Sequence, residues 1–300
     1  MTEILTIGID VGGTKMAAGV VDADGRVVAR RDVPTPTDSR EALVGAIVAA
    51  ARELAVEHHV GAVGIGVAGL VDSAGSAVRS ASHLPLRDEP LADEVSAAID
   101  LPVVVDNDAN VSALAESRLG AARGAVEAVL ITVGTGIGGA VILDGRVHRG
   151  WQGVAGEVGH LIVERDGRPC PCGSRGCWEQ YASGRALMRA AAAAGFHAPH
   201  GSAVTAAAVA GDHRAQGVFA EIGGWLGVGI ASLVAVLDPE IVVVGGGVSA
   251  AGSHLLEPAQ ASFADYLTAR ASRSEPRIVR AALGPDAGMI GAAELARSGR

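Results

Sequence analysis

Short apolar runs separated by glycine or Asp-Gly turns open the chain. The first three runs predict a three-stranded meander, at residues 4–9, 16–22 and 26–33. Residues 40–57 then carry apolar positions at helical spacing, and the runs 62–69 and 101–106 are continuous enough for buried parallel strands. The N-terminal part is therefore expected to be an α/β lobe.

The same order of elements returns in the second half of the chain. Residues 126–149 have the pattern strand, glycine turn, strand, Asp-Gly turn, strand, and the tetrapeptide DGRV occurs at 24–27 and again at 144–147. The pattern continues with helices at 183–194, 204–210 and 214–237, strands at 241–247 and 277–283, and a helix at 288–297. This repetition predicts two duplicated lobes, an N-terminal domain of residues 1–118 joined by a C-terminal helix at 288–300, and a second domain of residues 119–287.

Composition and charge narrow the class of protein. The 300 residues are 49% hydrophobic and 3% aromatic with 42 glycines, which is typical of a turn-rich globular chain. We expect no membrane span, because no uninterrupted apolar run approaches about 20 residues, and the first ten residues lack the pattern of a signal peptide. A cytoplasmic location follows. Lys and Arg total 24 against 33 acidic residues, and no basic face contains aromatics, so nucleic acid is not an expected partner.

Two matches to the pattern GxGxxG invite a dinucleotide-binding interpretation, which their context rejects. They begin at Gly64 and Gly134. The dinucleotide fingerprint needs a strand, a glycine turn and then a helix whose N-terminus holds the pyrophosphate. Strand-like sequence follows both matches, and the Walker A pattern is absent.

Glycine turns at equivalent places in the two lobes instead predict phosphate contacts. Glycine lets backbone N–H groups approach phosphate oxygens, Thr hydroxyls add donors, and an Asp can hold magnesium through water. The candidates are Asp10, Gly12, Gly13, Thr14 and Lys15 in the first turn, Gly134, Thr135 and Gly136 in the second, and Gly245, Gly246 and Gly247 after a later strand. Lys15 is the only lysine in the chain, which favours a compact ammonium near the phosphates. The alternative is two ordinary tight hairpins.

The sequence VVVDNDAN places Asn107 and Asp108 at the end of a buried strand, where open α/β sheets bind ligands. Asp108 could accept the proton of an attacking hydroxyl, and the Asn107 amide could orient neighbouring hydroxyls. The alternative is helix capping, which we expect of Asn110 rather than of the other two residues.

All three cysteines cluster in CPCGSRGC, with a histidine shortly before them. Three thiolates and one imidazole form the closed tetrahedral set of a structural zinc site, here His160, Cys170, Cys172 and Cys177. The alternative is three inert or redox thiols. A zinc-pinned loop would hold Glu179 beside Glu157, where the two carboxylates and the imidazole could grip sugar hydroxyls. For each glutamate, solvated surface charge is the alternative.

Taken in order, DVGGTK, NDAN, EVGH and CPCGSRGCWE resemble the ROK family of sugar kinases over nearly the whole chain, most closely its bacterial glucokinases. The resemblance implies two ribonuclease-H-like lobes of the actin-like ATPase fold around a central cleft. It also implies Asp108 as the base and zinc on the His/Cys set. The sugar contacts that it implies are Asn107, Glu157, His160 and Glu179.

These expectations describe a cytoplasmic kinase that transfers the γ-phosphoryl group of magnesium ATP to the 6-hydroxyl of glucose, in a homo-oligomer, dimer or tetramer. The sugar-side loop SASHLPLRDEPL departs from the family pattern, with His83 before Leu84 and no Trp. Another hexose (fructose, mannose or an N-acylhexosamine) therefore stays open. A non-catalytic sugar-sensing regulator is the alternative of a different class, and the family's repressors carry an N-terminal helix-turn-helix that we do not expect here. Polyphosphate as donor is disfavoured by the lack of a basic run.

Overall fold

The computed structural model describes residues 4–298 and divides into two compact units. Unit 1 holds residues 4–124, 146–155 and 285–298 of the described chain, and unit 2 holds residues 125–145 and 156–284. The ends of the predicted N-terminal domain and of the predicted helix 288–300, at residues 1–3 and 299–300, lie outside the described residues. Each unit is α/β, as the hydrophobic pattern predicts.

Unit 1 is built on a five-stranded sheet of order β3-β2-β1-β4-β8. Its strands are β1 (Leu5–Val11), β2 (Lys15–Val21), β3 (Val27–Pro34), β4 (Val60–Val67) and β8 (Val103–Asn107). The first three form the antiparallel meander, and β4 runs parallel to both β1 and β8. This order places the ends of β1, β4 and β8 at one edge of the sheet.

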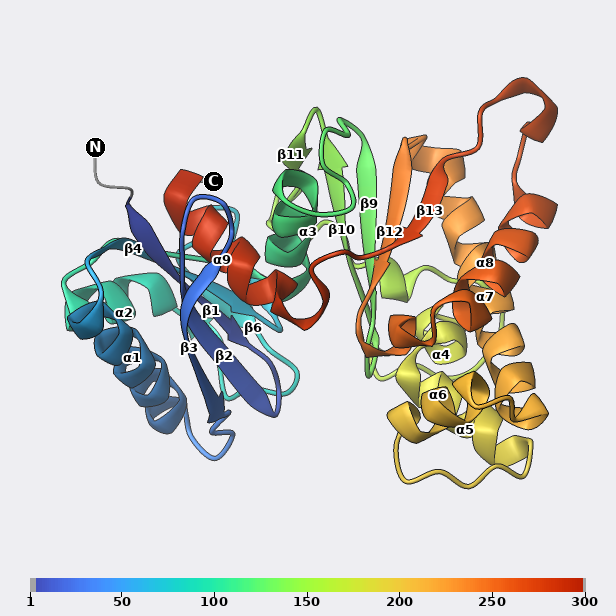
Figure 1. The fold of residues 1–300 in the computed structure, drawn as a ribbon, viewed down its shortest axis with the longest axis horizontal. Coiled ribbons are helices and arrows are strands. Elements are labelled where there is room, and N and C mark those ends of the chain that lie inside the picture. The colour runs from blue at the N-terminus through green and yellow to red at the C-terminus, as the bar shows by residue number, and fades with distance from the viewer. Residues whose placement is uncertain (1–3, 299–300) are drawn as a thin grey trace. The chain divides into compact units, whose positions relative to one another are not determined.

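Helices cover both faces of this sheet. They are α1 (Arg40–Glu57), α2 (Leu91–Ile99), α3 (Asp108–Arg118) and α9 (Ala287–Ser298). Side chains alternate between faces along a strand, so Ile7 and Ile9 pack in the core with α1 and α2 while Gly8 meets α9. Figure 1 shows α9, in red, beside the blue strands of this sheet. A small sheet completes the unit, with β5 (Leu70–Val71), β6 (Val78–Ser80) and β7 (Arg87–Glu89).

Unit 2 repeats the plan with the sheet order β11-β10-β9-β12-β13, whose edge strand β11 belongs to the segment 146–155 that is counted with unit 1. The strands are β9 (Ala128–Val133), β10 (Ile137–Leu143), β11 (Arg146–Val147), β12 (Ile241–Gly245) and β13 (Arg277–Arg280). Its helices are α4 (Glu179–Ala182), α5 (Gly184–Ala193), α6 (Gly201–Val209), α7 (His213–Leu237) and α8 (Ser253–Tyr266). Short 3₁₀ turns lie at Val158–His160, Gly247–Ala251, Arg270–Ser272 and Gly284–Asp286. The antiparallel pair β9–β10 corresponds to β1–β2, as the repeated pattern predicts.

Among the described residues, helix α7 has a length and an apolar composition that would suffice to cross a membrane, which the sequence analysis does not anticipate. Half of its most apolar stretch is buried inside the protein, where residues such as Phe219, Leu226 and Ile230 form the core of unit 2. The core helix of a soluble protein passes the same test of length and composition, so this one helix is weak evidence for a membrane span.

Candidate active site

Asn107 and Asp108 stand where β8 ends and α3 begins. The Asn107 Oδ1 atom accepts hydrogen bonds from the backbone N–H groups of Ala109 (2.9 Å) and Asn110 (3.2 Å), and its Nδ2 donates to the Gly69 carbonyl (3.1 Å). Asn107 is therefore the N-cap of α3. The prediction that Asn110 caps this helix is wrong, because Asn110 lies inside the first turn. Asp108 is the first residue of α3, and its side chain also accepts from the Ala109 N–H (2.9 Å).

Asp10 lies in the same unit and interacts electrostatically with Asp108. In the sheet register Asp10 pairs with Gly66, which in turn pairs with Asp106, so these residues form one row across β1, β4 and β8. Burial and, as the smaller effect, the negative charge of Asp108 together raise the pKa of Asp10 to about 7. The structure thus brings the two predicted carboxylates together in unit 1.

The turn between β1 and β2 is closed by its own backbone. The Gly12 N–H donates to the Lys15 carbonyl (3.1 Å), and Thr35 ties the turn to β3 through its N–H to the Thr14 carbonyl (3.1 Å) and its Oγ1 to the Gly12 carbonyl (2.8 Å). The predicted glycine turn is thus a hairpin whose shape is fixed from two sides.

Lys15 and His83 flank this turn. The Lys15 Nζ atom lies 3.2 Å from Asp32 Oδ1, and 57% of the lysine side chain is exposed. A phosphate contact of Lys15 therefore stays a prediction. A Cβ atom added to Gly13 would lie 3.4 Å from the Cβ of His83, which puts the unusual residue of the sugar-side loop beside the first glycine turn.

In unit 2 the turn Gly134–Gly136 packs against the N-terminus of α5. The Gly134 N–H donates to the Gly136 carbonyl (3.0 Å), while the Gly134 and Thr135 carbonyls accept from the N–H groups of Gly184 (2.7 Å) and Arg185 (3.3 Å). This turn is as firmly held as the one in unit 1.

The glycines Gly245–Gly247 adjoin that turn. Gly245 ends β12 in register with Thr132 of β9, and Gly247 begins a 3₁₀ turn. Gly246 has a φ of 80°, and a Cβ atom there would lie 2.5 Å from the carbonyl oxygen of Val133. Only glycine fits this position, because a side chain would collide with the backbone of Val133. Gly246 and Gly247 are both exposed, and nothing lies within 4 Å of a Cβ atom added to Gly247.

Glu179 connects the cysteine loop to the same glycine turn. Its Oε2 accepts a hydrogen bond from the Ile137 N–H (3.2 Å), its Oε1 lies 3.5 Å from Arg185 Nη2, and only 12% of the side chain is exposed. Helix α4, which Glu179 begins, is held by Arg168 and Arg189, whose guanidinium groups both donate to the Gln180 carbonyl (3.0 and 2.6 Å). Glu179 is not a solvated surface charge.

Four potential metal ligands converge in unit 2. One donor atom from each of His160, Cys170, Cys172 and Cys177 lies within 4.8 Å of all the others, and the cysteines are free thiols. The Cys172 and Cys177 sulfurs are 3.6 Å apart, and Cys170 Sγ is 3.8 Å from His160 Nδ1. Ligand bonds of about 2.3 Å in a tetrahedron require edges of roughly 3.8 Å. The group therefore has the donors and the spacing of a four-coordinate metal site.

The other ring nitrogen of His160 faces Glu157. The two side chains approach to 3.8 Å between Nε2 and Oε2. Burial raises the pKa of Glu157, His160 opposes this rise, and the charge of Glu179 adds to it. His160 can thus coordinate a metal through Nδ1 and form a hydrogen bond to a hydroxyl group through Nε2.

The predicted residues form two sets. Unit 1 gathers Asp10, the first glycine turn with Lys15, Asn107 and Asp108. Unit 2 gathers the second glycine turn, Gly245–Gly247, Glu157, Glu179 and the His/Cys cluster. Sequence reasoning missed Arg149, whose side chain contacts Asp106. No sequence motif marks that arginine, whereas the sequence VVVDNDAN places Asp106 at the strand end together with Asn107 and Asp108 but indicates no role for it.

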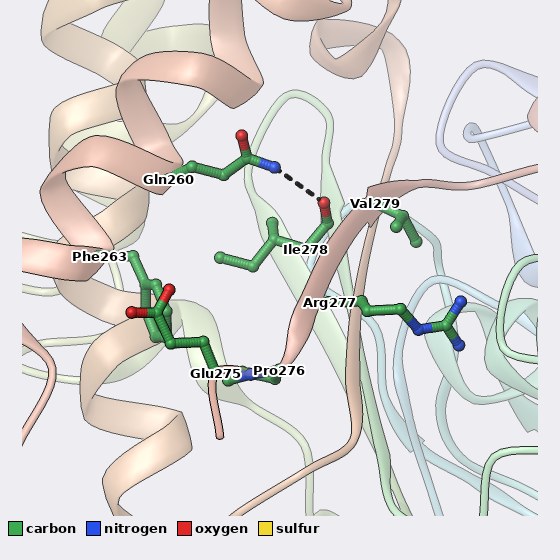
Figure 2. Close-up of a pocket in the computed structure, with 7 residues that line it drawn as sticks. All are labelled: Gln260, Phe263, Glu275, Pro276, Arg277, Ile278 and Val279. Carbon is green, nitrogen blue, oxygen red and sulfur yellow. Dashed lines mark hydrogen bonds between the residues drawn. The ribbon is translucent and has the colours of Figure 1, made fainter. Parts of the chain in front are cut away.

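A cavity of about 450 Å³ lies between α8 and β13, away from these residues. Figure 2 shows its lining, in which Gln260 Nε2 donates to the Ile278 carbonyl (3.1 Å). None of the predicted site residues lines this cavity.

Comparison with known proteins gives consistent similarities over the whole chain. The family model described as "ROK family" matches residues 6–298. A glucokinase from Streptomyces coelicolor is 42% identical, and an N-acetylmannosamine kinase from Escherichia coli is 36% identical, with 97–98% of this chain and 98% of each relative covered. A ROK family glucokinase from Streptomyces griseus, solved with glucose and AMPPNP, superposes with a TM-score of 0.90 at 44% identity, covering 98% of this chain and all of the other.

Proposed function

This chain belongs to the ROK family, and from that premise we propose that it is an ATP-dependent glucokinase that phosphorylates the 6-hydroxyl of glucose. Its fold is the actin-like ATPase fold of ROK sugar kinases. The observation that carries the proposal is the placement of Asp108 at the end of a buried strand, beside a second carboxylate and directly after the capping amide of Asn107.

Asp108 acts as the general base. Its carboxylate accepts the proton of the 6-hydroxyl as that oxygen bonds to the γ-phosphorus, and the bond from the γ-phosphorus to the β–γ bridging oxygen breaks, which gives glucose 6-phosphate and ADP. Asn107 fixes the direction of Asp108 through the cap of α3.

The two glycine turns hold the nucleotide. Their backbone N–H groups, the hydroxyls of Thr14 and Thr135 and the exposed backbone at Gly246 suit phosphate and ribose. The residues that fit magnesium bound with ATP are Asp10 and the turn beside it, and the ion neutralises phosphate charge when it is present.

The sugar hydroxyls form hydrogen bonds with Asn107, Glu157, His160 and Glu179. We assign zinc to the His/Cys cluster, because three thiolates and an imidazole at tetrahedral spacing suit it. A bound zinc supplies rigidity, because all four positions are filled by protein. The location we propose is the cytoplasm, and the assembly a homo-oligomer.

The test is an ADP-release assay over glucose, mannose, fructose, N-acetylglucosamine and N-acetylmannosamine. Glucose should give the highest kcat/KM. A higher value for an N-acylhexosamine would change the assigned substrate and leave the assignment as a kinase intact. An N-acylhexosamine kinase is the second candidate function, because an N-acetylmannosamine kinase is 36% identical to this chain. If none of these sugars gave ADP release, the kinase proposal would be refuted.

A further inference from the structure

Arg149 forms an ion pair with Asp106, the residue immediately before the pair Asn107–Asp108. The Arg149 Nε and Nη2 atoms both lie 2.7 Å from the same carboxylate oxygen, Asp106 Oδ2. All these residues belong to unit 1. We propose that Arg149 and Asp106 are positioning residues, which hold Asn107 and Asp108 in the direction that sugar binding and proton transfer require. The inference rests on the proposed kinase function.

The second oxygen of Asp106 organises the start of α3. Its Oδ1 accepts from the Asn107 N–H (2.8 Å) and from Asn110 Nδ2 (3.0 Å). Asn110 is 2% exposed, and its own Oδ1 has no hydrogen-bond partner within residues 4–298, so Asp106 sets the direction of this amide. One carboxylate therefore fixes the last residue of β8 and the first turn of α3, on either side of Asp108.

The pair is buried, unlike most ion pairs of this protein. The Asp106 side chain is 1% exposed and that of Arg149 is 16% exposed. A buried carboxylate needs a partner that fills its lone pairs, and a planar guanidinium can present two N–H groups to one oxygen where an ammonium presents a point charge. Loss of Arg149 would leave Asp106 with a buried charge, and the carboxylate would turn or take up a proton. Either change disturbs Oδ1 and the two groups that it holds.

Arg149 also ties a distant segment to this sheet edge. It lies in residues 146–155, which leave the sheet of unit 2, join unit 1 and then lead directly to Glu157. Its carbonyl accepts from the Ala155 N–H (3.0 Å), and Arg149 Nη1 donates to the Val147 carbonyl (3.3 Å). The arginine is thus fixed at both its backbone and its side chain, as a positioning residue requires.

The test compares Arg149→Met and Arg149→Lys with a matched control, Arg118→Met. Arg118 also lies in unit 1, on α3 itself, and pairs with a buried carboxylate, Glu294 (3.3 Å). Glucose phosphorylation by the wild-type protein is established first. Arg149→Met should then lower kcat/KM for glucose on the order of 10- to 100-fold, because small displacements of reacting groups reduce the rate by this much. The KM for ATP should stay within about 2-fold of the wild-type value. Arg149→Lys should recover only part of the loss. Arg118→Met should lower Tm and leave kcat/KM within about 2-fold.

Two outcomes overturn the inference. Wild-type kinetics in folded Arg149→Met would do so, and so would equal losses in Arg149→Met and Arg118→Met, which would indicate a general loss of stability. If Arg149→Met does not fold, Arg149→Lys decides, because it keeps the charge: reduced kcat at wild-type Tm supports positioning, and full activity contradicts it. If the wild-type protein phosphorylated no sugar, the proposed function would be refuted instead. This result is obtained before any variant is made, so the two failures are distinguished.

Discussion

The carboxylate of Glu179 accepts a hydrogen bond from the backbone N–H of Ile137 across 3.2 Å. Ile137 follows the glycine turn between β9 and β10, and Glu179 lies two residues after Cys177 of the metal cluster. The cluster and the turn are therefore mechanically connected through one side chain. Loss of the proposed zinc should weaken the binding of both sugar and nucleotide.

Replacement of one ligand tests this connection. Cys172→Ser should reduce bound zinc from one per chain to below one, and should raise the KM for glucose on the order of 10-fold because the loop no longer fixes Glu179. Cys172 is exposed, so the substitution removes little packing. Metal analysis and kinetics measure both effects, with Arg175→Ala, an exposed position of the same loop, as the control. Protein without zinc but with normal kinetics would disprove the architectural role.

Lys15 and Asp32 form a pair whose two members can be tested against each other. If the ammonium serves phosphate, Lys15→Ala should raise the KM for ATP or lower kcat with little change in glucose affinity, and Lys15→Arg should rescue incompletely. Asp32→Ala should leave both constants near wild type, because it removes only exposed ion pairs of small energetic value, with Lys15 and with Arg30 (3.1 Å). Equal effects of Lys15→Ala and Asp32→Ala would assign Lys15 to the surface pair alone.

Asp10 should make the free protein less stable as the pH rises. Its folded-state pKa of about 7 exceeds the ordinary value of 3.8, so between these values the folded state binds more protons than the unfolded state. Asp10→Asn should therefore raise the free energy of unfolding by up to about 4 kcal/mol above pH 7, and the gain should shrink as the pH falls towards 4. Denaturant unfolding without nucleotide measures this, and the variant should be an inactive kinase.

Glu240 provides a control of opposite sign. Hydrogen bonds from the backbone N–H groups of Val126 (2.9 Å) and Glu127 (3.3 Å) lower its pKa. Glu240→Gln should reduce stability at neutral pH, and the difference should fade as the pH falls below the ordinary value of 4.5. If the gain in the free energy of unfolding from Asp10→Asn did not change with pH, the raised pKa of the buried Asp10 carboxylate would be contradicted.

Much of the fold could be predicted from hydrophobic periodicity. Helix 40–57 is found with the expected bounds, and the repeat at 126–149 is the antiparallel start of the second sheet. Both dinucleotide patterns were correctly rejected, because Gly69 leads into β5 and Gly139 lies within β10. Helix α8 was missed because Pro258 and scattered polar residues conceal its apolar positions.

The site could be predicted only where residue types gather locally. The cysteine cluster is contained in a short segment with one nearby histidine, so its spacing shows it. The sequence favours the wrong asparagine as the cap of α3, because the strand β8 runs directly into the helix at Asn107 and a buried aspartate takes the Asn110 amide. The contact between Arg149 and Asp106 depends on tertiary structure, and the sequence holds no local sign of it.

In the proposed mechanism, Asp108 removes the proton of the sugar hydroxyl. Asp108→Asn keeps the size of the side chain and loses the base, so kcat should fall by roughly 10²- to 10⁴-fold. Asp93→Asn, an exposed carboxylate in the first turn of α2 in the same unit, is the control and should keep wild-type kcat.

The decisive measurement pairs steady-state kinetics with glucose titration calorimetry on Asp108→Asn. We expect a kcat reduced at least about 100-fold together with glucose binding that remains measurable. A kcat near the wild-type value would contradict the role of Asp108 as the base.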